Sequence, residues 1–581
     1  MANWEIVDMK HVMAVAACAA AVVVAGCRNM CTQTDVACDI VIYGSSPAAI
    51  AVAVQAGRMG ASSVIVSPET RIGGLTTGGL GQTDIGNKSA FGGIALEFYR
   101  DVAKWYADPT HWTRQKMEDY MPDGQCANSK GRESMWTFEP SAALAILEGW
   151  ERRYKLDIRR GEWLDRESGV KKEGGRIVSI KTLSGNVYRG KVFVDATYEG
   201  DLMAAAGISY TVGREANSVY GETINGIQRT LTRNHQLAAG VDPYVKRGDP
   251  SSGLLPGIEN DSIEPDGCGD RRVQAYCFRM CLTDDPENRI PFSKPDGYRE
   301  LDYELLFRNL EASSPGSAHG GIPWINSSMP NRKTDTNNRT GFSTDFIGGN
   351  WNYPEASYAE RKKILAAHLN YQQGLMWTLA NHPRVPEHIR KEVSKWGTCR
   401  DEFKDGLGDG WQSQLYVREA RRMVGEYVMT EHECRGERVA SRPIAFGAYG
   451  MDSHNCLRYV DSQGFARNEG NIEDYNANPP NSDKLFRRFP PYPIDYGAIV
   501  PKRGECENLF VPVCLSASHI AFGSIRMEPV FFALGQAAGA AAALASSRNS
   551  AVQDVPYEEL AARLPIVGDT GRALAVSAAR D

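Results

Sequence analysis

Residues 39–51 read Asp-Ile-Val-Ile-Tyr-Gly-Ser-Ser-Pro-Ala-Ala-Ile-Ala, and this stretch decides the fold of the chain. The β-favouring run before Gly44 predicts a buried strand of a parallel sheet, and the alanine-rich run that continues to Gly60 predicts a helix. Residues 62–66 predict a second strand. Strand, helix and strand at this spacing form the βαβ unit of a Rossmann-like α/β domain built on a parallel sheet.

The turn between the first strand and the helix matches a dinucleotide-binding fingerprint in part. Gly44 stands where the chain must turn sharply, while Ser46 and Ala49 replace the second and third glycines with small side chains. Backbone N–H groups at the start of the helix would bind phosphate groups. The residues expected to contact a cofactor at this turn are Gly44, Ser45, Ser46, Pro47 and Ala48. A βαβ unit that serves packing alone is the alternative.

The second strand ends without the acidic residue that usually binds a ribose hydroxyl. Ser67 stands in that place, with Glu69 two residues later, and a serine hydroxyl can still form the expected hydrogen bond. Residues 71–81 (RIGGLTTGGLG) follow as a glycine-dense loop, whose backbone can pass close to a bulky planar group. The loop residues expected to contact it are Arg71, Gly73, Gly74, Leu75, Gly78 and Gly79.

This arrangement resembles the glutathione-reductase-like FAD proteins, in which a Gly-Gly pair after the second strand lies against the diphosphate and the flavin. Residues 175–202 predict a hairpin and a strand ending in Asp-Ala-Thr, so the resemblance implies that Ala196 and Thr197 lie beneath the adenine half of FAD. Residues 508–513 predict a strand, and 531–545 predict a closing helix of small residues. The resemblance implies that Ser524 and Met527 contact the cofactor and that this helix points its N-terminus at the flavin.

The combined pattern is similar to one family, the bacterial FAD-dependent oxidoreductases of the FAD_oxidored type, over about residues 38–546. Further blocks similar to that family are residues 138–140 (FEP), 278–283 (FRMCLT), 333–335 (KTD), 342–346 (FSTDF), 415–422 (LYVREARR), 452–455 (DSHN) and 501–503 (PKR). The resemblance implies FAD as the cofactor and a redox reaction as the activity.

At 581 residues the chain is too long for one hydrophobic core. The FAD-binding domain is expected to be discontinuous, comprising residues 38–100, 155–215 and 495–548. A mixed α+β substrate region, called the cap below, is expected to comprise residues 101–154 and 216–494. Residues 549–581 are expected to form a C-terminal tail.

The N-terminus predicts export and lipid anchoring. Residues 12–26 are small and apolar and too short to span a bilayer comfortably, so residues 1–27 are interpreted as a lipoprotein signal peptide that ends at Cys27. Translation from Met9, which is followed by Lys10, would give a better signal than translation from Met1. Residues 28–37 are expected to form a tether, and the expected location is the cell envelope, on the periplasmic or outer-membrane face. A short apolar helix within the folded body is the alternative.

The charge and the cysteine content of the chain limit the kinds of partner and cofactor that are expected. A net charge of −6 with no concentrated basic patch argues against a nucleic-acid partner. The thirteen cysteines include no CxxC pair or ferredoxin-type run, so neither a metal site nor an iron–sulfur cluster is predicted. Membrane contact is expected only through a lipid on Cys27.

Three residues are the candidates for chemistry beside the flavin. His519 is expected in the loop between the last strand and the last helix, where it would take a proton, and His454 is the second candidate base. Arg526 is a candidate to bind the flavin carbonyls or an anionic substrate, with an ion pair to Glu528 as the alternative. Arg418 and Arg421 are expected to form salt bridges in a helix-like stretch. Cys281 and Cys514 are expected to be packed thiols rather than a redox pair.

The predicted function is hydride transfer from a small organic substrate to flavin, followed by reoxidation by an unidentified electron acceptor. A carbohydrate is one candidate substrate, because the cap is rich in aromatic and amide side chains such as Trp324, Asn350, Trp351 and Tyr353. Aromatic packing under a polar surface explains the same residues. Two other functions stay open: an exported carbohydrate-cleaving enzyme that uses a bound dinucleotide without net redox, and a non-catalytic lipid-anchored binding protein.

Overall fold

The computed structural model describes residues 34–564, except 83, 124–132, 261–263, 314–320 and 475–489. The predicted signal peptide, Cys27 and Met9 lie outside the described residues. Strand β1 (Asp35–Tyr43) begins inside the expected tether. Its first residues pair in parallel with strand β6, Asp35 opposite Val187 and Cys38 opposite Gly190, so residues 35–37 belong to the sheet.

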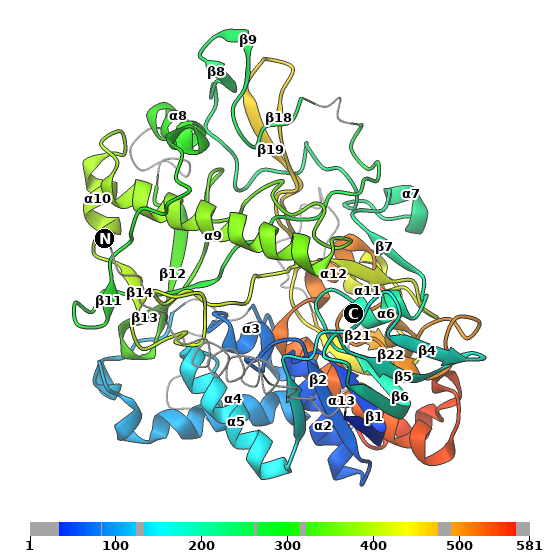
Figure 1. Ribbon diagram of the computed structural model, residues 1–581. Helices are drawn as coiled ribbons and strands as arrows, with labels where there is room; N and C mark the ends of the chain where they lie inside the picture. Colours follow the sequence, from blue (N-terminus) through cyan, green and yellow to red (C-terminus); the bar gives the residue numbers. More distant parts are fainter. Residues whose placement is uncertain are drawn as a thin grey trace, which may run out of the picture.

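A seven-stranded sheet forms the base of the molecule, in the lower part of Figure 1. Its order is β3-β2-β1-β6-β5-β4, with β22 beside β6, and β1, β2, β3, β6 and β22 pair in parallel. The remaining strands are β2 (Ser63–Ser67), β3 (Asp157–Arg160), β4 (Val170–Glu173), β5 (Arg176–Lys181), β6 (Val187–Asp195) and β22 (Leu509–Phe510). Strands β4 and β5 join the sheet antiparallel. The predicted α/β class and the gathering of distant segments into one sheet with a parallel core are confirmed.

Helices α2 (Pro47–Arg58) and α13 (Glu528–Arg548) pack closely against each other on this sheet. The approach depends on small residues, because a Cβ added at Gly535 would lie 2.4 Å from the Ala48 carbonyl oxygen. α13 is long and apolar enough to cross a membrane, yet 94% of its most apolar window is buried inside the protein. It is the core helix of the domain.

Two segments expected outside the domain pack onto α13. Helix α5 (Pro140–Tyr154), expected in the cap, lies beside α4 (Gly93–Ala107), and its Trp150 ring meets Phe532 with centroids 6.4 Å apart. Helix α14 (Tyr557–Ala561), which lies in the expected C-terminal tail, packs on α13. Since Val552 and Leu560 are fully buried, residues 549–564 form part of the body.

The cap lies above the sheet and carries its own antiparallel sheet, in the order β11-β14-β10-β13-β12 (Figure 1). These strands are β10 (Met280–Thr283), β11 (Arg289–Ile290), β12 (Trp324–Met329), β13 (Lys333–Asn338) and β14 (Gly397–Cys399). The long helix α9 (Tyr358–Asn381) crosses the cap, with α8 (Glu304–Ala312) and α10 (Glu387–Val393) nearby. Short two-stranded sheets pair β15 (Arg421–Met423) with β7 (Tyr210–Val212), β16 (Pro443–Gly447) with β21 (Tyr492–Asp495), β17 (Met451–Ser453) with β20 (Ile472–Asp474), β18 (Leu457–Val460) with β19 (Ala466–Glu469), and β8 (Tyr244–Lys246) with β9 (Asp249–Leu254).

A buried ion cluster joins the two parts. Asp201, the first residue of helix α6 (Asp201–Ala205), binds Arg361 of α9 at 2.6 Å and Arg421 of β15 at 2.9 Å. Arg166 approaches the same carboxylate at 3.0 Å. Because this carboxylate is only 4% exposed, its charge is compensated almost entirely by these guanidinium groups.

Candidate functional site

The turn after β1 has the geometry of a phosphate-binding turn. Gly44 has φ +111°, and a Cβ there would lie 2.6 Å from the Ala196 carbonyl oxygen, so the position requires glycine. Ser46 is the N-cap residue of α2, and its hydroxyl donates to that same carbonyl at 2.7 Å. The first N–H groups of a helix have no partner within the helix, so those of Ala48 and Ala49 are suited to an anion.

The glycine-rich loop lies between this turn and the start of α13. The Gly73 N–H donates to the Ser45 carbonyl at 2.7 Å. The loop then forms helix α3 (Gly74–Thr77), where the Thr76 hydroxyl donates to the Glu528 carboxylate at 2.7 Å. Burial raises the pKa of Glu528 to about 7. Three segments that are far apart in the chain therefore meet at one place, as the sequence predicted.

Several side chains predicted to bind the cofactor are occupied by protein contacts. Arg71 donates to the Thr77 carbonyl at 2.9 Å and pairs with Asp405, so it holds the loop to the cap. The Ser524 hydroxyl lies in helix α12 (His519–Ile525) and bonds to the Tyr449 carbonyl and the Tyr492 hydroxyl, each at 2.6 Å. The Thr197 hydroxyl donates to Asp195, and Met527 caps the start of α13. For these residues the structure leaves mainly backbone or apolar surface for a ligand.

Glu69 is better placed than Ser67 to bind a ribose. The Ser67 hydroxyl donates to the Glu69 carbonyl at 2.7 Å and accepts from the Glu69 N–H, so a local turn uses it. Among the described residues, no group makes a hydrogen bond to the Glu69 carboxylate. Burial, with the nearby charge of Glu199, raises the pKa of Glu69 to about 7. An acid without a protein partner at the end of β2 suits a pair of ribose hydroxyls.

On the cap side, the ring of Tyr416 lies among three arginines, each paired with an aspartate. The ring centroid is 4.4 Å from the Arg418 guanidinium carbon and 5.9 Å from that of Arg526. The three pairs are Arg279 with Asp335, Arg418 with Asp345, and Arg526 with Asp452. This Tyr416 cluster touches the glycine-rich loop, because a Cβ at Gly79 would meet the Arg279 carbonyl oxygen at 2.0 Å and Arg279 donates to the Gln82 carbonyl.

His454 and Asp452 lie at the edge of the Tyr416 cluster. His454 Nδ1 is 2.7 Å from Asp345, whose pKa lies well below its usual range because Arg418 and His454 outweigh the effect of burial. Nδ1 therefore carries the proton, and Nε2, 3.9 Å from Asp452, offers a lone pair. Burial lowers the pKa of His454 to about 3 and raises that of Asp452 to about 7. Each of the two side chains is 10% exposed.

His519 differs from its prediction. It is the first residue of α12 rather than a loop residue, because Ser518 caps a new helix there. Its Nδ1 lies 2.7 Å from Glu419 and its Nε2 lies 3.0 Å from the Ser453 hydroxyl, so both ring nitrogens have protein partners. Burial, reinforced by Arg422, lowers the pKa of His519 to about 3.

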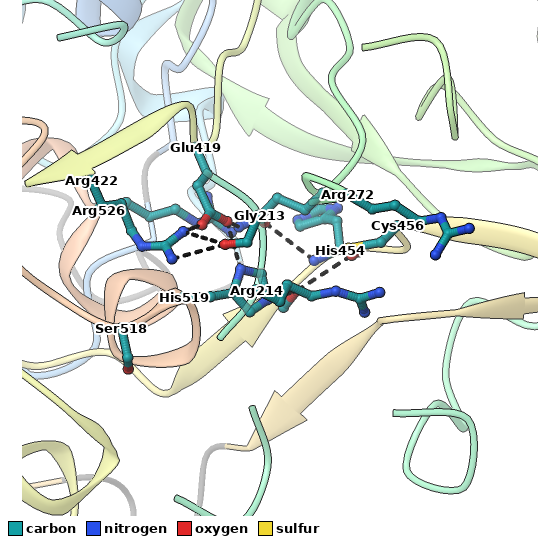
Figure 2. A network of polar contacts seen from close by, with 12 residues as sticks. Gly213, Arg214, Arg272, Glu419, Arg422, His454, Cys456, Ser518, His519 and Arg526 are labelled. Atoms are coloured by element: carbon teal, nitrogen blue, oxygen red, sulfur yellow. Dashed lines mark hydrogen bonds and ion pairs between the residues drawn. The ribbon is translucent and has the colours of Figure 1, made fainter. Parts of the chain in front are cut away.

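A buried charge network surrounds His519 (Figure 2). Arg422 binds Glu419 and donates to the Gly213 carbonyl at 2.8 Å, and Arg214 pairs with Glu469 at 2.7 Å. The predicted salt bridging of Arg418 and Arg421 is confirmed, since Arg418 pairs with Asp345 and Arg421 with Asp201. The structure contradicts the predicted helix there, since residues 421–423 form strand β15. Arg526 pairs with Asp452, so the alternative of an ion pair with Glu528 is wrong.

Cys281 and Cys514 are packed thiols, as expected. Cys281 lies beside Cys399 with the sulfur atoms 3.8 Å apart, and Cys514 donates to the Thr197 carbonyl. Burial raises the pKa of Cys281 and of Cys514. In the part of the chain that the structure describes, no group of three or more His, Cys, Asp or Glu residues could hold a metal ion.

Sequence reasoning assigned a role to Arg418 and Arg526 of the Tyr416 cluster but to none of its other charged residues. Arg279, Asp345 and Asp452 lie in sequence blocks that were recognised as similar to a family but whose function was left open. The signal was a charged residue inside a short apolar or β-favouring block, in residues 278–283, 342–346 and 451–453. A charged residue in such a block must find a partner when buried, yet only the folded chain shows which one.

Comparisons with known proteins point to one family. The model of the family described as FAD dependent oxidoreductase matches residues 39–564. No curated protein matches the chain. Similar solved structures include a flavin-containing monooxygenase from Stenotrophomonas maltophilia (18% identity, 32% of this chain and 43% of that chain, TM-score 0.18). Another is THI4 from Thermovibrio ammonificans (14% identity, 36% and 75% coverage, TM-score 0.21).

A third is NikD, an unusual amino acid oxidase essential for nikkomycin biosynthesis (17% identity, 31% of this chain and 57% of that chain, TM-score 0.20). The chain spans less than half the length of the monooxygenase. The family model covers most of the chain and matches the resemblance expected from the sequence.

Proposed function

Because this chain belongs to the FAD-dependent oxidoreductase family, we propose that it oxidises a small organic substrate with FAD held between the Gly44 turn, the glycine-rich loop and the start of α13. The observation that carries this proposal is the meeting of those three segments directly beside the Tyr416 cluster. Bound FAD supplies an acceptor for a hydride from substrate carbon.

The residues of the turn fit the dinucleotide half of FAD. The diphosphate would accept hydrogen bonds from the N–H groups at the start of α2, and the Glu69 carboxylate would accept hydrogen bonds from the ribose hydroxyls. The glycine-rich loop packs tightly on its protein neighbours, since an added Cβ at Gly73, Gly74 or Gly79 would meet other protein atoms at 2.0–2.5 Å. The partial positive charge at the N-terminus of α13 favours a reduced, anionic ring.

On the substrate side, Asp452 takes the proton that leaves with the hydride. Its pKa of about 7 makes it an effective base near neutral pH, whereas both nitrogens of His519 already have partners. His454 stays neutral and uses its Nε2 lone pair to orient a substrate hydroxyl or amine. Arg526 holds Asp452 in place from the opposite side. His519 positions Ser453, the neighbour of both residues in the chain.

Replacing Asp452 with asparagine is expected to lower kcat/KM by roughly 10²–10⁴-fold, because the proton acceptor is lost. In the unmodified enzyme the rate should rise with pH through about pH 7, as the carboxyl group ionises. The Asp452→Asn profile should be flat there. Asp409→Asn, at an exposed position, is the control and should keep both rate and profile. An unchanged profile in Asp452→Asn would assign the proton transfer to another group.

An absorbance spectrum of the purified protein, followed by anaerobic bleaching of the flavin, tests the function itself. Candidate substrates are alcohols, amines, polyols and glycosides, and the expected result is bleaching by one class with formation of the oxidised product. A sugar remains one of the candidate substrates, although the side chains expected to bind it are largely covered: Trp324 and Asn350 are buried and Trp351 is half-buried. Cleavage of a glycoside without any acceptor would favour the non-redox alternative. A colourless protein that FAD cannot reconstitute would favour a binding protein.

The proposed location is the cell envelope, with a lipid on Cys27 as the membrane contact. The support is the apolar run that ends in Val24-Ala25-Gly26-Cys27. Cys27→Ser is expected to move the protein from the membrane fraction to a soluble or unprocessed form. Mass spectrometry of the N-terminal peptide would show the lipid, and Cys38→Ser serves as the control. Membrane association that survives Cys27→Ser would contradict the anchor.

A further inference from the structure

A cavity lies in the cap, away from the residues proposed to hold FAD. Its volume is about 380 Å³, within the range of small-molecule sites. It opens between α9, the segment 342–349 and strand β18, and its aromatic walls are Tyr303, Phe342, Phe346, Trp351 and Tyr371. No residue of the Gly44 turn, the glycine-rich loop or the Tyr416 cluster lines it.

Arg458 is the unusual residue of this cavity. It is 4% exposed, and its Nε donates to Asn468 at 3.0 Å and its Nη2 to the Gly341 carbonyl at 3.1 Å. Its Nη1 is next to Gly257, where an added Cβ would lie 3.5 Å away, and makes no hydrogen bond to any described residue. No carboxylate of a described residue pairs with this guanidinium, unlike Arg279, Arg418 and Arg526.

A buried guanidinium without a counter-ion is costly, because burial removes water without supplying an opposite charge. Burial lowers the pKa of Arg458 to about 10, which still leaves it charged at neutral pH. Besides its two hydrogen bonds, the described part of the chain offers this guanidinium the face of Phe342, 5.2 Å from the guanidinium carbon. A ligand anion at Nη1 would supply the missing charge and form a charge-assisted hydrogen bond.

We propose that this cavity binds a small aromatic carboxylate, with its anionic group on Arg458 and its ring among the aromatic walls. The aromatic lining offers faces and edges for a planar ring. A single negative charge suits the site better than a phosphate dianion. The other charged lining residues are Glu259, Arg299 and Asp302. Asp302 pairs with Arg299 at 2.5 Å, and Glu259 would repel a second negative charge on a ligand.

Benzoate and cinnamate are the probes, with benzyl alcohol as the uncharged analogue and inorganic phosphate as the anion without a ring. Isothermal titration on the full FAD-loaded protein is expected to show one site for the aromatic carboxylates. Benzyl alcohol should bind roughly 10- to 100-fold more weakly, since it lacks the charge-assisted contact. Phosphate should not displace benzoate.

Two variants locate the site. Arg458→Gln should weaken benzoate binding at least about tenfold and leave the affinity for benzyl alcohol nearly unchanged. Ala367→Phe provides a test that does not depend on a buried arginine, because Ala367 is an exposed residue of α9 that lines the cavity and its new ring would fill it. Ala366→Phe is the matched control, on the same helix and exposed but outside the lining.

The proposal holds if Ala367→Phe abolishes benzoate binding while Ala366→Phe retains it. Benzoate binding of unchanged strength in Ala367→Phe would overturn it, as would equal affinities for benzoate and benzyl alcohol. Failure of both aromatic carboxylates to bind, or displacement of benzoate by phosphate, would equally overturn it. None of these outcomes depends on which substrate the flavin oxidises.

Discussion

Asp201→Asn is expected to lower the free energy of unfolding by about 3–5 kcal/mol, the cost of breaking a buried ion pair by removing one partner. The substitution keeps the shape of the side chain but leaves Arg361 and Arg421 buried without their shared counter-ion. Because those arginines belong to α9 and β15 while Asp201 begins α6, the loss acts at the junction between the cap and the sheet domain. Urea unfolding followed by circular dichroism measures it.

The loss of unfolding free energy in Asp201→Asn depends on pH, and the direction of that dependence follows from the pKa of Asp201. Burial alone would raise the pKa of Asp201, but Arg361, Arg166 and Arg421 outweigh it and hold that pKa below its usual range. Ionised Asp201 therefore stabilises the folded state fully above about pH 4, the ordinary pKa of an aspartate. This stabilisation is lost as the pH falls through the lower pKa that Asp201 has in the folded protein. Glu360→Gln, which removes an exposed pair with Lys363 on α9, is the control and should change stability by at most about 1 kcal/mol. Equal effects of the two substitutions would contradict the bridging role of Asp201.

Gly44→Ala is expected to leave the purified protein without flavin, or with an affinity for FAD at least about 100-fold weaker, on the scale of a displaced phosphate-binding turn. An added Cβ would lie 2.6 Å from the Ala196 oxygen at a backbone φ of +111°, so the turn must shift. That shift moves the first N–H groups of α2 away from the diphosphate. The absorbance of flavin relative to protein, before and after addition of FAD, measures the result.

Gly57→Ala, on the helix α2 that follows the Gly44 turn, is the matched control. An added Cβ there meets nothing within 4 Å, and the helical position favours alanine over glycine. This variant should keep a full complement of flavin and be as stable as the original protein or slightly more so. If Gly44→Ala folds and retains flavin like Gly57→Ala, the phosphates lie elsewhere. A melting curve of each variant distinguishes loss of flavin from loss of fold.

The local patterns of the chain were reliable where short-range physics determines structure. The strand before Gly44, the helix after Ser46 and the strand that ends at Asp195 depend on apolar runs, turn glycines and a proline at the start of a helix. Residues 415–422 were different. Their charges suggested a helix with internal salt bridges, but the partners of Arg421 lie more than sixty residues away, and they hold the segment extended.

Glycine turns and β-favouring runs are local features, so the amino-acid sequence alone indicates a dinucleotide-binding α/β fold, and its resemblance to a known family implies FAD as the cofactor. Only the tertiary structure decided which charged groups meet. Asp452, in the middle of strand β17, pairs with Arg526 just after α12, and His454 is positioned by Asp345 from more than a hundred residues away. Such pairings depend on distance and burial in three dimensions, which no spacing along the chain encodes.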